Sequence, residues 1–569
     1  SDLRSYLQDR LPDYMIPSYF KELDILPMTP NGKIDRKSLP DFEIEASSSY
    51  QAPSTATEER LVSIWSEVLK LDTSIIGTAT SFFELGGNSI RAVHVINLIE
   101  KEFNIKIPIK LIFEHTTIKS LSIKIMNFKT STREEIPKIK LKANDKYITS
   151  SAQERMFYKY LQNTDSLAYN ISGAYKISGV LDVPKIKETL EKLVDRHAVL
   201  RANFALSNIG VLQTINTTKK VSLTILEMDK YAHLDNVYLD FVKPFDLESE
   251  LPIRFALLPV DENTNILFVD VHHIVCDGIS LNILMNDFKE LYQNKASVAP
   301  DFNYIDYSYW QNNLASNLTN QKEYWLHQLS GDLPVLTLPI SGSKESADIT
   351  IADFKTLGIT DQDYKDIKRF LVQSDVSEFM FFISIFYILL QKLSDNSDII
   401  IGTDVIGRTH PRFQDVIGTF INILPLRSNV DTETSYQIFL DDIKENVLNA
   451  FENQEYQFDE MISELSKKQE VVSEDLVSVH FAFVNYFEGE KEFFIEDLKF
   501  ESLHLIKDET TQYEFKIEVS EHQSEYAVKF IYSKELYDSD IIQVFTEYYY
   551  NIIKSVLHDP SVLIGQIEV

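Results

Sequence analysis

The sequence has very little cysteine: Cys276 is its one cysteine in 569 residues. A single thiol excludes an internal disulfide framework and suits a reducing compartment, so we expect a cytoplasmic protein. No apolar signal-peptide core is found at the start, where SDLRSYLQDRLPDYMIP is amphipathic and charged. The longest apolar run, FMFFISIFYILL at 379–390, is shorter than the roughly 20 residues of a spanning helix. This run predicts a buried helix.

Positive charge is also scarce. The chain has 55 Lys and Arg against 86 Asp and Glu, which gives a formal net charge of −31. Such a chain repels phosphate backbones and anionic membranes unless it carries a local basic patch. The nearest candidate, PKIKLKANDK at 137–146, has no interleaved aromatic residues and is typical of a solvated linker. We therefore expect neither a nucleic acid nor a membrane as a partner.

The remaining composition is that of a globular protein, with 44% hydrophobic and 25% charged residues. The chain is too long for one compact core, so it predicts a multidomain protein. Leu61, Ile64, Trp65, Val68 and Leu69 follow the spacing of one helix face and open a stretch with three to four helices. The last 420 or so residues mix helix and strand patterns, which indicates an α/β or α+β fold.

Composition shifts divide the chain further. A stump at 1–45 is too short to hold a core, and the turn-rich stretch at 327–348 is the best seam between two lobes. The predicted parts are the stump 1–45, a linker 46–55, a small all-α unit 56–128, a linker 129–148, a first lobe 149–335 and a second lobe 336–569.

The first chemical motif is SFFELGGNSIRAVHVI at 81–96, in which Gly-Gly and Asn88 precede a helix that starts at Ser89 or Ile90. Serine is a common helix N-cap, so GGNS alone indicates an ordinary cap. A serine at this place also presents its hydroxyl where the helix dipole and free N–H groups favour an attached phosphate. The whole of 56–128 resembles acyl and peptidyl carrier proteins. This resemblance implies a four-helix bundle whose Ser89 carries 4'-phosphopantetheine.

The second motif is VHHIVCDG at 271–278, which fits a metal clamp, an acid/base pair or two packed core histidines. Successive strand residues point to opposite faces, so His272 and His273 line one cavity only if the strand has already ended. Asp277 and Gly278 read as a turn, and no further Cys or His cluster supplies metal ligands. We therefore expect no metal site, and at least one of the two histidines to be structural.

The motif has companions along the chain that resemble, in order, the core motifs of condensation domains of nonribosomal peptide synthetases. Two positions depart from the family pattern: this chain has Ala198 where the family usually has an acidic residue, and Gln457 where it usually has a proline. A seventh motif, at 472–486, lacks its expected arginine elements. The stretches that carry the resemblance are SSAQERMF (150–157), RHAVLRANF (196–204), HHIVCDG (272–278), YIDYSYWQ (304–311), VIGTFINILPLR (416–427) and NQEYQFDEMI (453–462).

The resemblance implies a two-lobed fold like chloramphenicol acetyltransferase and an enzyme that forms a peptide bond between two thioester-bound substrates. His273 is then the channel-facing residue, either as general base or as a hydrogen-bonding positioner of the amine. His272 and Asp277 are structural, and Arg408 in GTDVIGR is the expected partner of Asp277 from the other lobe. Gly278 lets the backbone approach the reacting thioester closely.

The stump resembles the end of an adenylation domain through LPDYMIP and NGKIDRKSLP, with Lys33 at the place of its catalytic lysine. The family further implies an upstream adenylation domain that loads Ser89, a phosphopantetheinyl transferase and a downstream acceptor carrier. Two alternatives share the same motifs: an epimerization domain, and an inactive condensation-like docking platform. A heterocyclization domain would carry an aspartate in place of His273.

Overall fold

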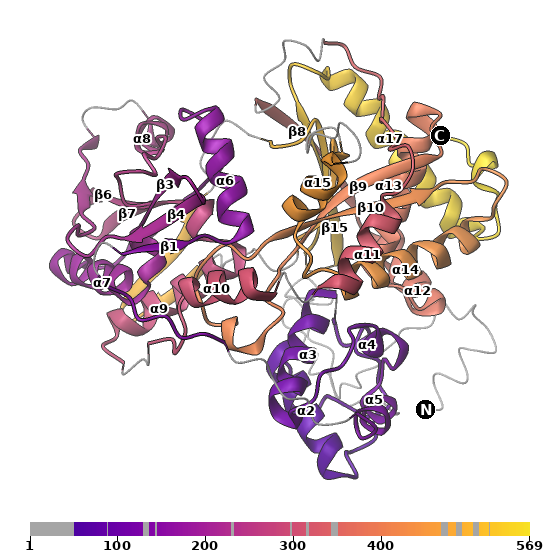
Figure 1. The fold of residues 1–569 in the computed structure, drawn as a ribbon, viewed down its shortest axis with the longest axis horizontal. Helices are drawn as coiled ribbons and strands as arrows, with labels where there is room; N and C mark the ends of the chain where they lie inside the picture. Colours follow the sequence, from indigo (N-terminus) through magenta and orange to yellow (C-terminus); the bar gives the residue numbers. More distant parts are fainter. Residues whose placement is uncertain are drawn as a thin grey trace, which may run out of the picture.

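The computed structural model of the chain describes residues 50–87, 89–128, 136–142, 145–228, 233–295, 299–314, 318–342, 351–467, 476–484, 492–503, 511–522 and 524–569. The stump at 1–45, with Lys33, lies outside the described residues, as does Asn88. Figure 1 shows a helical unit, in indigo, below two larger lobes that each contain a β-sheet. The α/β class expected for the large part of the chain is confirmed.

The helical unit begins with the helix that the spacing of Leu61 to Leu69 predicts. A capping box starts it, in which Thr55 accepts from the backbone N–H of Glu58 and the Glu58 carboxylate accepts from that of Thr55. Trp65 is fully buried and packs edge-on against Phe82, with ring centroids 5.1 Å apart. The helices described in this unit are α2 (Ala56–Leu69), α3 (Ser89–Phe103), α4 (Lys110–Glu114) and α5 (Ile118–Ile125).

The first lobe is built on a sheet with the strand order β12-β13-β2-β7-β6-β5. Alternate residues face opposite sides. Phe255 and Leu257 pack under α7 (Val183–Arg196) and α9 (Gly278–Tyr292), whereas Ala256 and Leu258 pack under α8 (Leu234–Phe241). The strands are β2 (Asn170–Ser178), β5 (Leu223–Ile225), β6 (Ile253–Asp261), β7 (Thr264–His272), β12 (Glu492–Ile495) and β13 (Leu498–Leu503).

A three-stranded sheet of order β1-β4-β3 completes this lobe. Its strands are β1 (Lys146–Ile148), β3 (Ala202–Ser207) and β4 (Gly210–Ile215). The helices of the lobe are α6 (Ser151–Gln162), α7 (Val183–Arg196), α8 (Leu234–Phe241), α9 (Gly278–Tyr292) and α10 (Tyr304–Leu314), with a 3₁₀ turn η2 (Ala198–Arg201).

The second lobe holds a sheet of order β10-β9-β11-β14-β15-β8, with α13 (Glu378–Ser394) in its core. Every residue of α13 from Phe379 to Gln391 is buried, which confirms the buried helix predicted from the apolar run. The strands are β8 (Ala352–Ile359), β9 (Asp398–Val405), β10 (Asn422–Asn429), β11 (Val479–Phe483), β14 (Phe515–His522) and β15 (Glu525–Ser533). The other helices are α11 (Thr319–Gln328), α12 (Asp361–Ser374), α14 (Tyr436–Glu452), α15 (Phe458–Ser466) and α17 (Ser539–His558).

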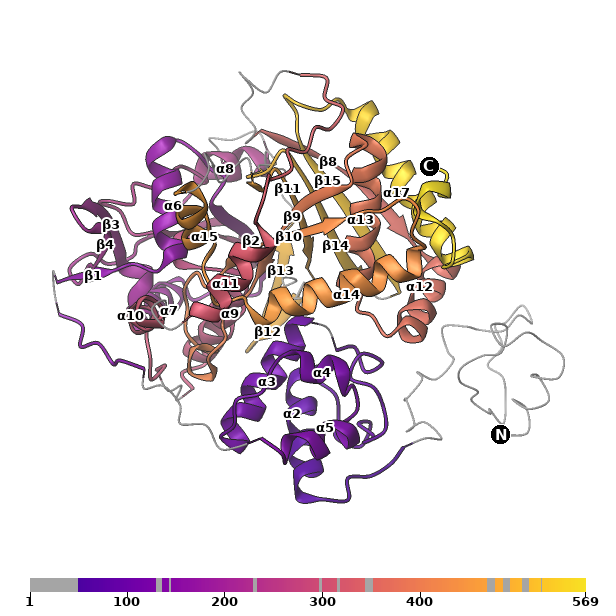
Figure 2. The ribbon, with the colours of Figure 1, turned by 45° about the vertical axis from the view of Figure 1, so that its right-hand side comes forward.

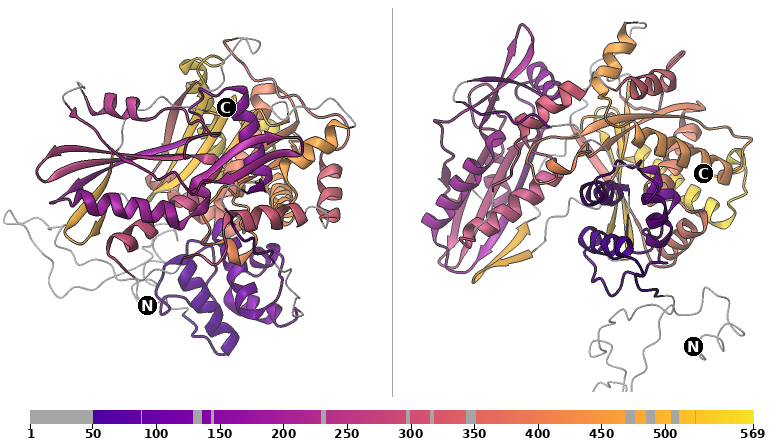
Figure 3. Two further views of the ribbon diagram at one scale, coloured as in Figure 1. Left: turned by 60° about the vertical axis from the view of Figure 1, so that its left-hand side comes forward. Right: turned by 60° about the horizontal axis from the view of Figure 1, so that its bottom comes forward.

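Two segments of the later sequence cross into the first lobe. Strand β13 pairs antiparallel with β2, and Phe413, Val416 and Phe420 are buried in the core beneath α10. Figure 3 shows the yellow-orange strands β12 and β13 lying along the first lobe, away from the rest of the second. The two lobes are therefore joined by exchanged elements as well as by the chain connection.

In the part of the chain that the structure describes, no single helix is long and apolar enough to cross a membrane. The pair α12 and α13 meets that length and composition together, but the two helices are bent by 104° relative to one another.

Candidate active site

The VHHIVCDG stretch covers the end of β7, a short turn and the start of α9. Strand β7 ends at His272, and His273 opens the 3₁₀ turn η4 (His273–Val275). Asp277 is the N-cap of α9, where its Oδ1 accepts a hydrogen bond from the Ser280 backbone N–H at 2.8 Å. Because the strand ends before His273, strand alternation no longer fixes the direction of its side chain.

His272 is packed into the first lobe. Its ring lies between Tyr169 and Phe245, with centroid distances of 6.1 and 5.9 Å, and its Nδ1 accepts from the Ile274 N–H at 3.1 Å. Burial lowers the pKa of His272 to about 3, so the ring is neutral at pH 7. A buried, neutral ring with this hydrogen bond holds the turn.

His273 instead faces open space. It lines two cavities, of about 560 and 350 Å³, and its Nδ1 has no hydrogen-bond partner among the described residues. Burial lowers the pKa of His273, which keeps the imidazole neutral near pH 7. A neutral imidazole in a cavity is able to accept a proton or a hydrogen bond from a bound amine.

The two cavities meet between the lobes. The larger one extends to Val93 of the helical unit, and the smaller one to Arg155 and Lys159 on α6. The shared lining residues are His273, Asp404, Ile421, Lys516 and Glu518. The cavities together form a channel with two ends, and His273 lies where they join.

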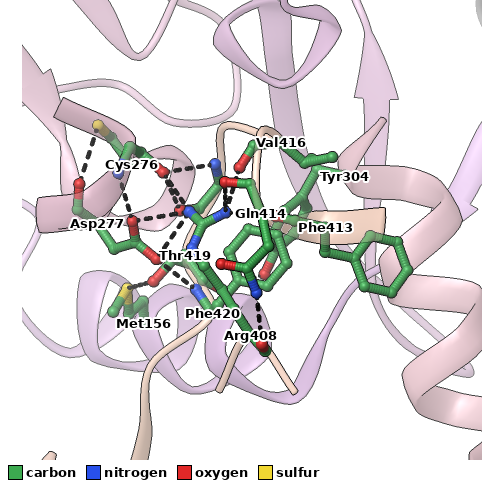
Figure 4. A network of polar contacts seen from close by, with 12 residues as sticks. Met156, Cys276, Asp277, Tyr304, Arg408, Phe413, Gln414, Val416, Thr419 and Phe420 are labelled. Atoms are coloured by element: carbon green, nitrogen blue, oxygen red, sulfur yellow. Dashed lines mark hydrogen bonds and ion pairs between the residues drawn. The ribbon is translucent and has the colours of Figure 1, made fainter. Parts of the chain in front are cut away.

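Asp277 lies in a network that ties the lobes together, shown in Figure 4. Arg408 Nη2 lies 3.0 Å from Asp277 Oδ1, and both side chains are almost completely buried, 1% and 3% exposed. Asp277 Oδ2 also accepts from the Phe420 backbone N–H at 3.1 Å. Arg408 Nη1 donates to the carbonyls of Phe413 and Val416 at 2.7 and 2.6 Å. The carboxylate and the guanidinium thus fix the 408–420 segment against the turn that carries His273.

The helical unit touches the lobes at the end of the larger cavity. Asn97 on α3 is 2% exposed, and its Nδ2 donates to the backbone carbonyl of Arg408 at 2.8 Å. The backbone N–H of Lys110 donates to Glu452 Oε1 on α14 at 2.8 Å, and Figure 2 shows α4 below α14. Since Val93 lines the cavity one turn from the start of α3, this helix begins close to the channel.

Ser89 is the first residue of α3, a helix of 15 residues. Before it, Gly86 has a φ of +86°, and a Cβ on Gly87 would lie 2.6 Å from the Phe82 carbonyl oxygen. The Arg91 guanidinium donates to the Gly86 carbonyl at 2.6 Å and brings a positive charge to the same loop. A helix N-terminus, two glycines and a cation fit a phosphate ester at this helix start.

In the described residues, no group of three or more His, Cys, Asp and Glu side chains is arranged to hold a metal ion.

Comparison with protein families identifies the chain. Residues 143–569 match the condensation domain family, and residues 59–125 match the phosphopantetheine attachment site. The chain belongs to the condensation domain family. A carrier region followed by a condensation domain is the domain order found in nonribosomal peptide synthetases. The cofactor of the carrier region is 4'-phosphopantetheine. The condensation domain is an acyltransferase-like enzyme that forms peptide bonds.

Several peptide synthetases align with the whole of this chain, across both the carrier region and the condensation domain. Gramicidin S synthase 2 of Aneurinibacillus migulanus is 30% identical over 573 residues, and bacitracin synthase 1 of Bacillus licheniformis is 32% identical over 574. Surfactin synthase subunit 2 of Bacillus subtilis (strain 168) is 30% identical over 572 residues. Each alignment covers 100% of this chain but only 13%, 11% and 16% of the respective relative.

Solved structures share the fold of the condensation domain. The X-domain from teicoplanin biosynthesis superposes with a TM-score of 0.69 at 17% identity, covering 76% of this chain and 99% of that one. The condensation domain from Monacolin K polyketide synthase MokA gives a TM-score of 0.63 at 17% identity, covering 74% and 99%.

Sequence analysis missed several residues of this site. Asn97 carried no signal, because its partner is a backbone carbonyl 311 positions away. Asp404 lies in GTDVIGR, which was noted for Arg408 alone, although an aspartate inside an apolar strand is itself a signal. His480 lies in the divergent stretch at 472–486, and Lys516 lies in no motif that the sequence shows.

Proposed function

We propose that this chain is a carrier–condensation unit of a nonribosomal peptide synthetase in which Ser89 holds the donor and His273 acts where donor and acceptor meet. The observation that carries the proposal is the position of His273. It lies at the junction of two cavities, one of which extends to the carrier helix that starts with Ser89. The carrier region, proposed as a four-helix bundle over 56–128, is the donor side.

The carrier residues fit the 4'-phosphopantetheine group. When bound, the group supplies a thiol that holds the acyl chain as a thioester. Ser89 would be the attachment residue, with the first N–H groups of α3 and Arg91 facing its phosphate charge. The contact of Asn97 with Arg408 holds this helix start beside the larger cavity. The donor therefore enters from the carrier side.

His273 would act on the amine of the acceptor. Its neutral imidazole, set by burial, accepts a hydrogen bond or a proton from that amine as the C–N bond forms. His272 and Asp277 hold the turn, Arg408 anchors it to the second lobe, and Gly278 begins α9 beside the reacting groups. Most of the catalysis is then positioning, since a thioester is already activated.

The smaller cavity, beside α6, would admit the acceptor. It extends to Arg155 and Lys159 on α6, whereas the larger cavity extends to Val93 of the carrier region. The partners proposed for the chain are a phosphopantetheinyl transferase, an upstream adenylation domain that loads Ser89 and a downstream acceptor carrier. We further propose two lobes like those of chloramphenicol acetyltransferase, at 149–335 and 336–569 along the sequence, with α11 packed on the second lobe and β12 and β13 on the first. The linker at 129–148 joins them to the carrier.

The test loads the full chain with aminoacyl-phosphopantetheine, using aminoacyl-coenzyme A and a promiscuous phosphopantetheinyl transferase. Aminoacyl thioesters of N-acetylcysteamine, one for each side-chain class, then serve as acceptors. Mass spectrometry follows both products, and stereochemical analysis of the hydrolysed donor residue shows whether it has been inverted. We expect a dipeptidyl thioester and a carrier that has lost its acyl group. A donor residue that is inverted but not transferred would identify an epimerization domain, and no change at all an inactive platform.

Two variants control the loading step. Ser89→Ala should take up no phosphopantetheine, whereas Ser63→Ala, on the exposed face of α2, should load as the wild type does. Loading of Ser89→Ala at the normal rate would remove the carrier assignment.

Residues 1–45 form a separate part of the proposal. We assign them to the tail of an adenylation domain, with Lys33 at the place of its catalytic lysine, and expect no adenylation activity from the tail alone. Amino acid and ATP should therefore give no pyrophosphate exchange with this chain. Measurable exchange would contradict the assignment.

A further inference from the structure

The wall of the channel opposite His273 carries a row of charged side chains on the second-lobe sheet. Asp404 comes from β9, His480 from β11, and Lys516 and Glu518 from β14. In the register of the parallel strands, His480 lies opposite Gly402 and Lys516, and Ala482 lies opposite Glu518. Since alternate residues share a face, the four side chains lie on the same side of the sheet.

The charges in this row are unevenly paired. Lys516 Nζ lies 2.7 Å from Glu518 Oε1, which matches one cation with one carboxylate. Asp404 Oδ1 lies 3.3 Å from Nε2 of His480, whose ring is fully buried and stacks on Tyr513 at 4.3 Å. Glu518 therefore has a lysine as its ion-pair partner, whereas the nearest partner of Asp404 is the imidazole of His480.

Asp404 is also open to the channel. Its side chain is 32% exposed although the residue lies deep between the lobes, and it lines both cavities. Burial raises the pKa of Asp404, but the contact with His480 and the charge of Lys516 outweigh burial and lower this pKa to about 2. An ionised carboxylate therefore faces the point where the two substrates meet.

The reaction brings a cation to this point. An α-amino group has a pKa of roughly 7.7–8.0, so much of the acceptor arrives as an ammonium ion at neutral pH. Inside a channel a carboxylate attracts such an ion strongly, because water screens the pair less than at the surface. His273, across the same junction, is neutral and ready to accept a proton.

We propose that Asp404 binds the ammonium group of the acceptor aminoacyl thioester and positions its nitrogen beside His273. This inference rests on the function proposed above. For a primary amine, one ammonium proton passes to His273 and then to water, a second ends on the sulfur that leaves, and the third stays on the amide nitrogen. The C–N bond forms as the C–S bond of the donor thioester breaks.

The first test measures binding without chemistry, on the full chain before it is loaded. The probes are the amides of N-acetylethylenediamine with each amino acid of the acceptor panel, and their N-acetylated counterparts, which carry no positive charge. Titration calorimetry should show that the wild type binds the best amine roughly 10- to 100-fold more tightly than its acetylated form, as expected for a charged hydrogen bond. In Asp404→Asn this preference should fall to within a factor of three.

Two further variants complete the binding test. Asp404→Glu should keep part of the preference for the amine, because it keeps the charge. Asp398→Asn removes a carboxylate of the same strand that pairs with Arg427 and lines neither cavity, so it should keep the full preference. An unchanged preference in Asp404→Asn, in a protein with the thermal unfolding of the wild type, would overturn the proposal.

The second test uses the loaded chain and the acceptor that the wild type condenses fastest. Asp404→Asn should raise KM for that acceptor at least tenfold and leave kcat at saturating acceptor within a factor of three. The aminooxy analogue of the same acceptor is neutral at pH 7, so both proteins should use it equally well. An equal loss with the amine and the aminooxy acceptor would show that Asp404 supports the fold or the acceptor side chain, and would refute ammonium binding. Failure of the wild type with every acceptor would count against the proposed function instead.

Discussion

The strongest structural consequence concerns Asp277 and Arg408, which join the two lobes beneath the catalytic turn. The Arg408 side chain is 1% exposed, and the substitution Asp277→Ala removes the carboxylate that pairs with it. Removing one partner of such a pair costs about 3–5 kcal/mol of unfolding free energy, because the remaining charge is buried and unpaired. The carbonyls of Phe413 and Val416 still accept from Arg408, which places the expected loss near the lower end, about 3 kcal/mol.

Guanidinium unfolding measures this loss. Trp310 lies 5.4 Å from Phe413 and reports on the affected region in a Trp65→Phe, Trp325→Phe background. In the double variant Asp277→Ala, Arg408→Met the stranded charge is gone, so at least half of the lost stability should return. Glu188→Ala, which breaks the exposed pair of Glu188 with Lys192, should change stability by less than about 0.5 kcal/mol. A loss below about 1 kcal/mol in Asp277→Ala would refute the reasoning.

Three further predictions concern other contacts. The pKa of His272 is about 3 in the folded protein and 6.5 in the unfolded chain, so the folded state is fully stable with a neutral ring above pH 6.5 and loses stability as the pH falls towards 3. Between pH 6.5 and 5 the unfolding free energy of the wild type should fall by about 2 kcal/mol more than that of His272→Asn. Urea titrations at the two pH values measure this difference. Asn97→Ala should load with phosphopantetheine normally but condense more slowly, because its hydrogen bond to the Arg408 carbonyl is lost; equal rates of dipeptide formation would show that this contact does not matter for docking. Gly87→Ala should lower the melting temperature of the carrier by several degrees, since its Cβ would clash with Phe82, and an unchanged melting curve would contradict this.

Local patterns predicted the elements that hold the site better than they predicted its walls. The start of α3 at Ser89 follows from a short-range signal, the glycines before a helix. The end of β7 at His272 does not, because the sequence pattern extends the strand to His273. The partner of Asp277 was expected from the family resemblance, and the structure places Arg408 beside it.

The channel wall depends on contacts that no local pattern records. Asp404, His480 and Lys516 meet only because β9, β11 and β14 pair in parallel, 76 and 36 residues apart along the chain from one residue to the next. The return of β13 to pair with β2 joins strands more than 300 residues apart. Long-range pairing of this kind is fixed by the assembled core and not by nearby residues, so the sequence read alone could not place it.

The central claim is that His273 acts directly in peptide-bond formation at the junction of the two cavities. Its most direct test compares the wild type with His273→Ala, both loaded to the same extent on Ser89, in single-turnover transfer to an aminoacyl N-acetylcysteamine thioester. Loss of a general base or of an amine-positioning hydrogen bond should slow transfer by a factor of about 10² to 10⁴, with unchanged loading and unchanged thermal unfolding. Transfer at the wild-type rate by His273→Ala would contradict the account.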